Sequence, residues 1–371
     1  TGLSWIFMSA FGALPFFLSG QIPSYVDAFF EMVSGFTTTG ASILTDVEAL
    51  SRCNLFWRSF SHWLGGMGVL VFLLAVVPGA RKNGGTGIYL MRAESPGPSV
   101  DKLTPHLRQT AMILYGIYIL LTALCIGCLL LGGMPVFDSF CIAFGTAGTG
   151  GFAIKNSSMG GYSYFLQTVV TVFMFLFGVN FSLYYMLLLR KFKAVFKNEE
   201  LRLYFGIAAG SIVLIAINIS RMYNTVYESV HHAAFQVVSI MTTTGYGTVD
   251  FEQWPAFSKA ILLSLMFIGA SAGSTGGGLK VSRVLLLMKS IRRTIRKGLE
   301  TGGSFYRLRY RKKRTKRKRL VLLCDVSGSM VQFSEFALRF IQSLNQVSES
   351  SRVFLFSETA VEADAFRLQN M

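Results

Sequence analysis

Long apolar runs alternate with shorter amphipathic stretches along most of the chain. Each long run approaches the ~20 apolar residues that a helix needs to cross a bilayer. We expect membrane-spanning segments at residues 3–18, 55–77, 110–131, 165–189, 203–219 and 256–288. The amphipathic stretch at residues 226–241 is too short and too polar to cross, which predicts a helix that enters the membrane from outside and stops halfway. The pattern therefore predicts an all-α membrane protein.

A threonine–glycine loop follows three of the amphipathic stretches. The loops read TTTGAS at residues 37–42, GTAGTGGF at 145–152 and TTTGYGTVD at 242–250. A long apolar span comes next each time, so the chain repeats a unit of helix, short helix, polar loop and helix. Ordinary helix-breaking loops of a membrane protein would explain one such loop, but not three of the same type and phase.

These loops offer many neutral oxygen atoms and no ring of carboxylates. Non-helical backbone inside a membrane domain is tolerated only where it lines a cavity or is buried in protein. Threonine adds hydroxyl oxygens, glycine allows the positive φ that aims carbonyls inward, and the C-terminus of a helix favours a cation. This chemistry suits a dehydrated monovalent cation, potassium above all, better than a divalent one. It predicts ion transport with no covalent chemistry, no enzyme activity and no required cofactor.

Composition and charge agree with a membrane protein and orient it. Hydrophobic residues make up 52% of the chain and charged residues 15%, whereas soluble proteins carry about a quarter charged residues. The net charge is +16, and basic side chains gather at residues 81–108, 190–202 and 289–319. By the positive-inside rule these segments are cytoplasmic, so all three loops open toward the outer face.

The last expected span contains a glycine-rich break, GASAGSTGGGLK at residues 269–280. It is not a nucleotide phosphate loop, because a preceding strand and the Walker spacing are missing. In membrane proteins such a break lines a pathway, so we expect an intramembrane loop that obstructs or opens a pore. Lys280 and Arg283 would either repel a cation at the inner mouth or extend to the cytoplasmic surface. The candidate gate residues are Gly269, Gly273, Ser274, Gly276, Gly277, Gly278, Lys280 and Arg283.

Histidines and cysteines add little to this interpretation. His231 and His232 lie together on the short helix at residues 226–241, either as a proton relay or metal site or, as we prefer, as a pair near the outer headgroups. Close helix packing explains His62, which lies beside two glycines. Cys125 and Cys128 have the spacing of one half of a zinc site, but we interpret them as small apolar residues of a membrane helix.

Five segments carry a resemblance to a known family. They are RSFSHWLGGMGVLVFLLAVVP (58–78), MRAESPGPSVDKLTP (91–105), GTGGFA (148–153), TTTGYGTVDFEQWP (242–255) and AGSTGGGLKVSRVLLLMK (272–289). Over residues 1–300 or so, the chain resembles the Trk/Ktr potassium transporter superfamily, and the Trk-type membrane subunit in particular.

The resemblance implies four repeats of helix, pore helix, filter loop and helix around a pseudo-fourfold pore. It implies potassium as the transported ion, and a multi-pass protein of the bacterial inner membrane whose basic loops and C-terminal tail are cytoplasmic. Carried over by motif, the filter residues are Thr39, Gly40, Thr149, Gly150, Thr244 and Gly245. The family's gate matches the break at residues 269–280. Its partners are the lipid bilayer, a second copy in a homodimer and a cytoplasmic nucleotide-binding regulatory subunit.

The chain departs from this pattern at both ends. We expect it to begin inside the first repeat and to lack the fourth, because the sequence turns polar and basic after Arg296. The expected parts are a first pore repeat at 1–78, a cytoplasmic linker at 79–108, a second repeat at 109–190, a linker at 191–201, a third repeat at 202–290, a basic linker at 291–319 and a fragment at 320–371. We therefore expect a potassium pore that is incomplete in this chain and does not conduct alone.

Residues 307–371 have a different character. The basic run at 307–319 is interpreted as solvated or lipid-facing, with no nucleic-acid partner. The strand LVLLCDVSGSM (320–330), a helix at 333–347 and a strand at 352–356 resemble the start of a CoxE-like von Willebrand factor A domain, a short α/β fragment. That resemblance implies a magnesium site at Asp325, Ser327 and Ser329. Later ligands have no room before the end, and two strands do not close a doubly wound sheet, so we expect this site to be incomplete.

Two alternative functions remain open. The chain would be a membrane-anchored, metal-dependent interaction module if the C-terminal fragment folded and held magnesium, although six spans with three polar loops exceed what an anchor needs. It would be a proton- or sodium-coupled solute carrier if a span held a coupling carboxylate. Against the carrier, no Asp, Glu or Lys lies deep within an expected span.

Overall fold

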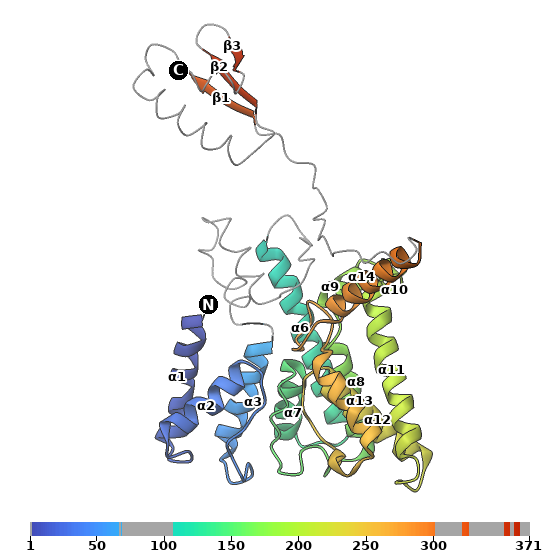
Figure 1. Ribbon diagram of the computed structural model, residues 1–371. Helices are drawn as coiled ribbons and strands as arrows, with labels where there is room; N and C mark the ends of the chain where they lie inside the picture. Colours follow the sequence, from blue (N-terminus) through green and yellow to red (C-terminus); the bar gives the residue numbers. More distant parts are fainter. Residues whose placement is uncertain are drawn as a thin grey trace. The chain divides into compact units, whose positions relative to one another are not determined.

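The computed structural model describes residues 2–66, 68, 107–300, 321–325, 352–356 and 360–363 (Figure 1). The chain divides into two compact units, residues 1–296 and residues 297–371. Helices build the described part of the first unit, and the described part of the second unit contains strands of one sheet.

Three helices of the first unit each precede a threonine–glycine loop, and we call them the short helices (Figure 1). The short helices are α2 (Tyr25–Phe36), α7 (Val136–Gly148) and α12 (Val226–Met241). The others are α1 (Gly2–Leu18), α3 (Arg52–Gly66), α6 (Leu107–Leu131), α8 (Tyr164–Phe177), α9 (Phe181–Leu188), α10 (Phe192–Phe196), α11 (Glu199–Ile219), α13 (Ala256–Phe267), α14 (Val281–Glu300) and a 3-10 turn at Phe251–Gln253. Each short helix packs against a neighbour: α2 on α1, α7 on α3, and α12 on α11.

Two described helices are long and apolar enough to cross a membrane, Ala111–Leu131 and Glu199–Ile219. Both match expected spans. Large apolar side chains on them face outward, for example Leu131 with 89% and Ile217 with 68% of its surface exposed. In a soluble protein such a surface would mark a binding patch, whereas here it is the surface expected to face lipid. Of the span expected at residues 55–77, the structure describes the part that belongs to α3 and residue 68.

The single span expected at residues 165–189 is instead two helices, α8 and α9, which meet at 91°. The break has local causes. The side chain of Asn180 caps α9 by accepting a hydrogen bond from the N–H of Ser182, 2.9 Å away. Two bonds to another segment also hold the break open, from Ser271 N–H to Gly178 O (3.0 Å) and from Phe181 N–H to Gly273 O (3.0 Å).

The span expected at residues 256–288 is interrupted where its glycines predicted. Helix α13 ends at Phe267 and α14 begins at Val281. The intervening segment folds back on itself, because Gly269 N–H donates to Leu279 O (2.9 Å) and Leu279 N–H donates to Phe267 O (3.2 Å). Its two ends are therefore close together, and its middle is free to extend toward the break between α8 and α9.

The described strands of the second unit form a sheet of order β1-β2-β3. Strands β1 (Val321–Asp325) and β2 (Arg352–Phe356) pair in parallel, as two of the expected elements. Strand β3 (Ala360–Ala363) was not predicted, and it pairs antiparallel with β2. A short connection is enough for an antiparallel return, which explains how so brief a strand joins the sheet. The helix expected at residues 333–347 lies outside the described residues.

Candidate ion-binding site

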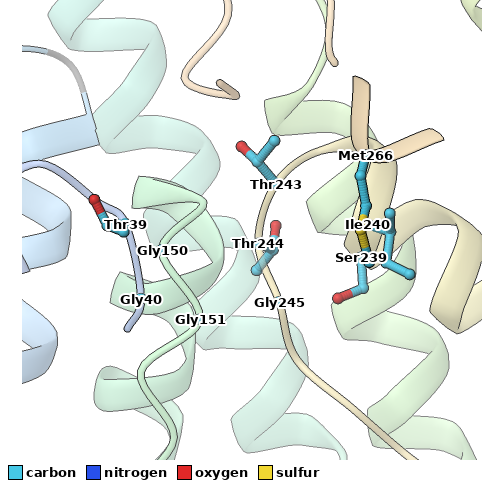
Figure 2. A pocket seen from close by; sticks show the side chains of 10 residues that line it. All are labelled: Thr39, Gly40, Gly150, Gly151, Ser239, Ile240, Thr243, Thr244, Gly245 and Met266. Atoms are coloured by element: carbon cyan, nitrogen blue, oxygen red, sulfur yellow. The ribbon is translucent and has the colours of Figure 1, made fainter. Parts of the chain in front are cut away.

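The three threonine–glycine loops meet around one cavity of about 250 Å³ (Figure 2). The residues that line it are Thr39, Gly40, Gly150, Gly151, Ser239, Ile240, Thr243, Thr244, Gly245 and Met266. The second loop lies between the first and the third (Figure 2). Segments far apart in the sequence thus face a common space.

Each loop leaves its short helix through the same hydrogen-bonded turn. An N–H donates to the carbonyl five residues earlier at Thr39 (to Ser34, 2.9 Å), Gly150 (to Gly145, 3.1 Å) and Thr244 (to Ser239, 2.9 Å). The residue before each of these donors has a left-handed backbone, with φ of 55° at Thr38, 53° at Thr149 and 60° at Thr243. This arrangement is the Schellman ending of a helix, in which loop N–H groups satisfy the last helical carbonyls.

The shared turn aligns the three loops residue by residue. Gly40, Gly151 and Gly245 each follow the donor residue, and each has a positive φ, of 76°, 73° and 85°. Gly150, which the motif matched to Gly40 and Gly245, instead occupies the position of Thr39 and Thr244. The second loop is therefore shifted by one residue from the motif-based alignment, because a glycine stands where the other loops have a threonine.

Thr149 is correspondingly placed behind the cavity rather than on it. It is fully buried, and its hydroxyl donates to the carbonyl of Gly148 at 2.7 Å. The other five predicted filter residues line the cavity.

Neighbouring loops approach so closely that side chains are excluded at two positions. A β-carbon added to Gly40 would lie 2.0 Å from the carbonyl oxygen of Gly150. One added to Gly151 would lie 1.8 Å from the carbonyl oxygen of Thr244. Both distances are far below contact, so glycine is required by the neighbouring backbone as well as by φ.

Loop carbonyl oxygens remain available to a ligand. Within the part of the chain that the structure describes, no hydrogen bond ends on the carbonyls of Thr39, Gly150 or Thr244. The threonine hydroxyls reinforce the turns in the outer two loops, since Thr37 and Thr242 each donate to a carbonyl four residues earlier at 2.7 Å. The cavity is thus bordered by backbone oxygens whose own N–H groups are already used.

A buried tyrosine joins the second and third loops. The hydroxyl of Tyr246 lies 3.3 Å from the carbonyl oxygens of both Ile142 and Phe152. Farther along, Met159 N–H donates to Gly247 O at 2.9 Å. These bonds fix the two loops against each other.

The histidines are packing residues of this region. His231 Nε2 lies 2.8 Å from Gln167 Oε1, and His232 Nδ1 lies 3.1 Å from Thr248 Oγ1. Both side chains are buried in the protein, and their depth relative to the outer headgroups stays a prediction. His62 stacks on Phe152 with ring centres 4.0 Å apart, and close packing describes it well.

The glycine-rich segment between α13 and α14 borders a second cavity, of about 370 Å³. Gly273, Ser274, Thr275, Gly276, Gly277, Gly278 and Lys280 line it together with Thr37, Thr38, Gly65, Gly66 and Gly68. One bond connects this segment to the third loop, from Gly277 N–H to Thr243 Oγ1 at 2.7 Å. Candidate gate and candidate filter are therefore in direct contact.

The two basic residues proposed near the gate behave differently. Lys280 is buried with 8% of its surface exposed, and its Nζ donates to the carbonyl of Gly276. It does not extend to the cytoplasmic surface, so that alternative is wrong for this residue. Arg283 is exposed. Gly269 packs against Gly277 and Gly278, where the segment closes on itself.

The magnesium-type site is only partly within reach of the structure. Asp325 is the last residue of β1, whereas Ser327 and Ser329 lie outside the described residues. Across the described segments, no group of three or more His, Cys, Asp or Glu side chains is arranged to hold a metal ion.

The sequence interpretation missed a buried ion pair, Glu31 with Arg58, and the role of Tyr246. A signal for the pair was present, because a single Glu interrupts the short helix at 25–36 and a single Arg interrupts the apolar run that begins at residue 55. Glu31 lies on a short helix and not in an expected span, so the absence of acidic residues deep within the spans did not extend to it.

Comparisons with known proteins agree with the geometry. The profile of the TrkH family, described as cation transport proteins, matches residues 1–322. A second profile, for CoxE-like proteins containing a von Willebrand factor A domain, matches residues 289–366.

Individual relatives point the same way. The chain is 39% identical over 302 residues to the Trk system potassium uptake protein TrkH of Salmonella typhimurium, covering 80% of this chain and 62% of the relative. It is 37% identical over 297 residues to TrkG of Escherichia coli, covering 78% and 60%. The crystal structure of the potassium transporter TrkH from Vibrio parahaemolyticus superimposes with a TM-score of 0.69 at 30% identity, covering 93% of this chain and 69% of that one. The chain spans about three fifths of the length of these curated relatives.

We predict that Gly40→Ala destabilises the protein far more than Gly20→Ala. Both glycines have a positive φ, 76° and 69°, so both substitutions cost about 1–2 kcal/mol for a left-handed backbone. At Gly20 an added β-carbon meets nothing within 4 Å, whereas at Gly40 it collides with the second loop, which adds about 1–3 kcal/mol. Thermal unfolding of the purified full chain in detergent measures the difference. Equal shifts for the two variants would contradict the close approach of the loops.

Proposed function

Because the chain belongs to the TrkH family of cation transport proteins, we propose that it carries potassium ions across a membrane through the cavity between its three loops. The observation that carries this proposal is the shared Schellman turn, which leaves unpaired carbonyl oxygens at equivalent positions of the three loops. Relatives named as potassium uptake proteins support the choice of ion. They also favour transport over an enzymatic role.

In this proposal the ion exchanges water for neutral oxygens. Thr39, Gly40, Gly150, Gly151, Thr244 and Gly245 form the filter, with Thr149 supporting it from behind. Potassium binds well to several backbone carbonyls without a full negative charge, because its dehydration costs less than that of a divalent ion. The C-terminal ends of the three short helices add partial negative charge next to the loops that line the cavity. No resident cofactor is needed for this chemistry.

We propose that the glycine-rich segment at residues 269–280 gates the path. Because Gly277 N–H donates to Thr243 Oγ1, a movement of this segment would break or shift a hydrogen bond of the third loop. Lys280 supplies a positive charge on the second cavity, and its bond to Gly276 holds the segment in a folded form. Opening would require this bond and those to Gly178 and Phe181 to exchange partners.

The chain's setting follows the family. We propose a multi-pass protein of the bacterial inner membrane with residues 79–108, 191–201 and 291–319 as cytoplasmic linkers between pore repeats at 1–78, 109–190 and 202–290. A homodimer and a nucleotide-binding regulatory subunit on the cytoplasmic side are the expected partners. The metal-dependent interaction module is not favoured as the main function, since the TrkH profile covers far more of the chain than the CoxE-like one.

We predict that potassium stabilises the purified full chain. A ligand that binds only the folded state at 100 times its Kd adds about 2.7 kcal/mol of stability. Thermal unfolding should therefore shift upward in KCl relative to choline chloride at the same ionic strength, and the shift should shrink for Gly245→Ala. Gly133→Ala is the control, because Gly133 also has a positive φ, of 81°, with open space around it. Identical unfolding in KCl and choline chloride would contradict the proposal.

We further predict opposite accessibility for the loops and the basic segments. In a background without the native cysteines, Ser42→Cys should react with a membrane-impermeant maleimide added outside intact cells. Lys193→Cys, in the basic segment at 190–202, should react only after the membrane is permeabilised. Labelling of both positions from the same side would refute the proposed orientation.

A further inference from the structure

A buried ion pair lies directly behind the first two loops. Glu31 on α2 and Arg58 on α3 join through Oε1 and Nε at 2.5 Å, with 0% and 3% of their side chains exposed. The other ion pair found among the described residues, Glu199 with Lys289, is 60% and 53% exposed. Neither Glu31 nor Arg58 lines the cavity, so the pair does not touch an ion bound there.

Glu31 holds the first loop. The hydroxyl of Ser42 donates to its two carboxylate oxygens, at 3.0 and 3.2 Å. The N–H of Ile43 donates to Oε2 at 3.2 Å. Both donors lie just beyond Gly40, so the carboxylate fixes where the first loop runs after it leaves the cavity.

Arg58 holds the second loop. Its Nη1 donates to the carbonyl of Ala153 at 2.9 Å, and its guanidinium lies 3.7 Å from the centre of the Phe152 ring. The carbonyl of Phe152 in turn accepts a hydrogen bond from Tyr246 of the third loop, at 3.3 Å. One connected set of contacts therefore runs from the first loop through the ion pair to the second and third loops.

Stability alone does not account for a pair in this place. Burying two charges is costly, and apolar residues of similar size often serve a protein's stability equally well or better. What apolar residues do not supply is direction, because a carboxylate accepts several N–H and O–H groups and a guanidinium donates in a fixed plane. The pair is arranged to use this directionality on two loop backbones at once.

We propose that Glu31 and Arg58 are positioning residues that set the distance between the first and second loops and thereby the cavity's preference for potassium over sodium. The part of this inference that concerns ion preference rests on the proposed function. The part that concerns loop position rests on the contacts of Glu31 and Arg58 alone. A cavity held at one width discriminates between ions of different radius, whereas loops free to move apart or together adapt to either ion.

The test compares four variants of the purified full chain with the wild type. Glu31→Gln with Arg58→Met removes both charges without leaving one unpaired. Charge reversal, Glu31→Arg with Arg58→Glu, keeps an ion pair but sends its hydrogen bonds to the wrong loops. Ser42→Ala leaves the pair intact and removes the hydroxyl contacts between the first loop and the Glu31 carboxylate. It keeps the test available if the double variants at Glu31 and Arg58 fail to fold. Glu199→Gln with Lys289→Met is the matched control on the exposed pair.

Two readouts are taken on each version. Hydrogen exchange of the peptides that contain residues 37–44 and 149–154 reports loop position, and calorimetric titration with KCl and NaCl reports the affinity ratio. We expect at least tenfold faster exchange in both peptides for the two double variants at Glu31 and Arg58. Exchange should be faster in the first peptide alone for Ser42→Ala, and unchanged from the wild type for the control. The potassium-to-sodium affinity ratio should fall at least fivefold in both double variants at Glu31 and Arg58.

Wild-type exchange in the loops of the neutral double variant would overturn the positioning role. Loosened loops with an unchanged ion ratio would overturn the role in selectivity, as would full recovery of the ratio by charge reversal. If the wild-type chain binds neither ion, the proposed function fails, and the exchange measurements still decide whether the pair positions the loops.

Discussion

Backbone groups that leave a helix inside a membrane domain must find partners within the protein, because no water is present to replace them. The three loops meet this constraint with one solution. Each short helix ends in a Schellman turn, so the first N–H groups of the loop satisfy the last carbonyls of the helix. The cost is a left-handed residue and a glycine in every loop, and the result is a set of loop carbonyls with no N–H partner of their own. The way the helices end thus supplies the carbonyl oxygens on which the proposed cation site depends.

The same constraint explains why the surroundings of the loops are polar and yet deeply buried. Arg58, Glu31, His62 and Tyr246 all have less than a tenth of their surface exposed, and each contacts a loop or the residue next to one. Such groups are expensive to bury unless they are paired, and here their partners are backbone carbonyls and N–H groups of the loops. The packing behind the cavity thus restrains the loops, while the faces of α6 and α11 remain apolar and exposed.

The glycine-rich segment obeys the constraint in another way. It interrupts one span and inserts into the bend of another. There Ser271 N–H donates to Gly178 O, and Phe181 N–H donates to Gly273 O. Two straight helices would leave no room for these bonds. The break in the α8–α9 span and the break in the α13–α14 span therefore lie side by side, and each supplies hydrogen-bond partners to the other. The glycines at residues 269–280 predict the break between α13 and α14. The break between α8 and α9 is marked by no more than Gly178 and Asn180 within a long apolar run.

The helical membrane class, the three short helices and the loops that follow them could be predicted from the residue pattern, because length, apolarity and glycine content act locally along the chain. The family could be predicted as well, and the profile over residues 1–322 confirmed it. Three features required the folded chain: Gly151 shares the backbone conformation of Gly40 and Gly245, Lys280 is buried, and Glu31 pairs with Arg58. These features depend on distances between segments far apart in the chain, and a linear pattern of residues carries no measure of those distances.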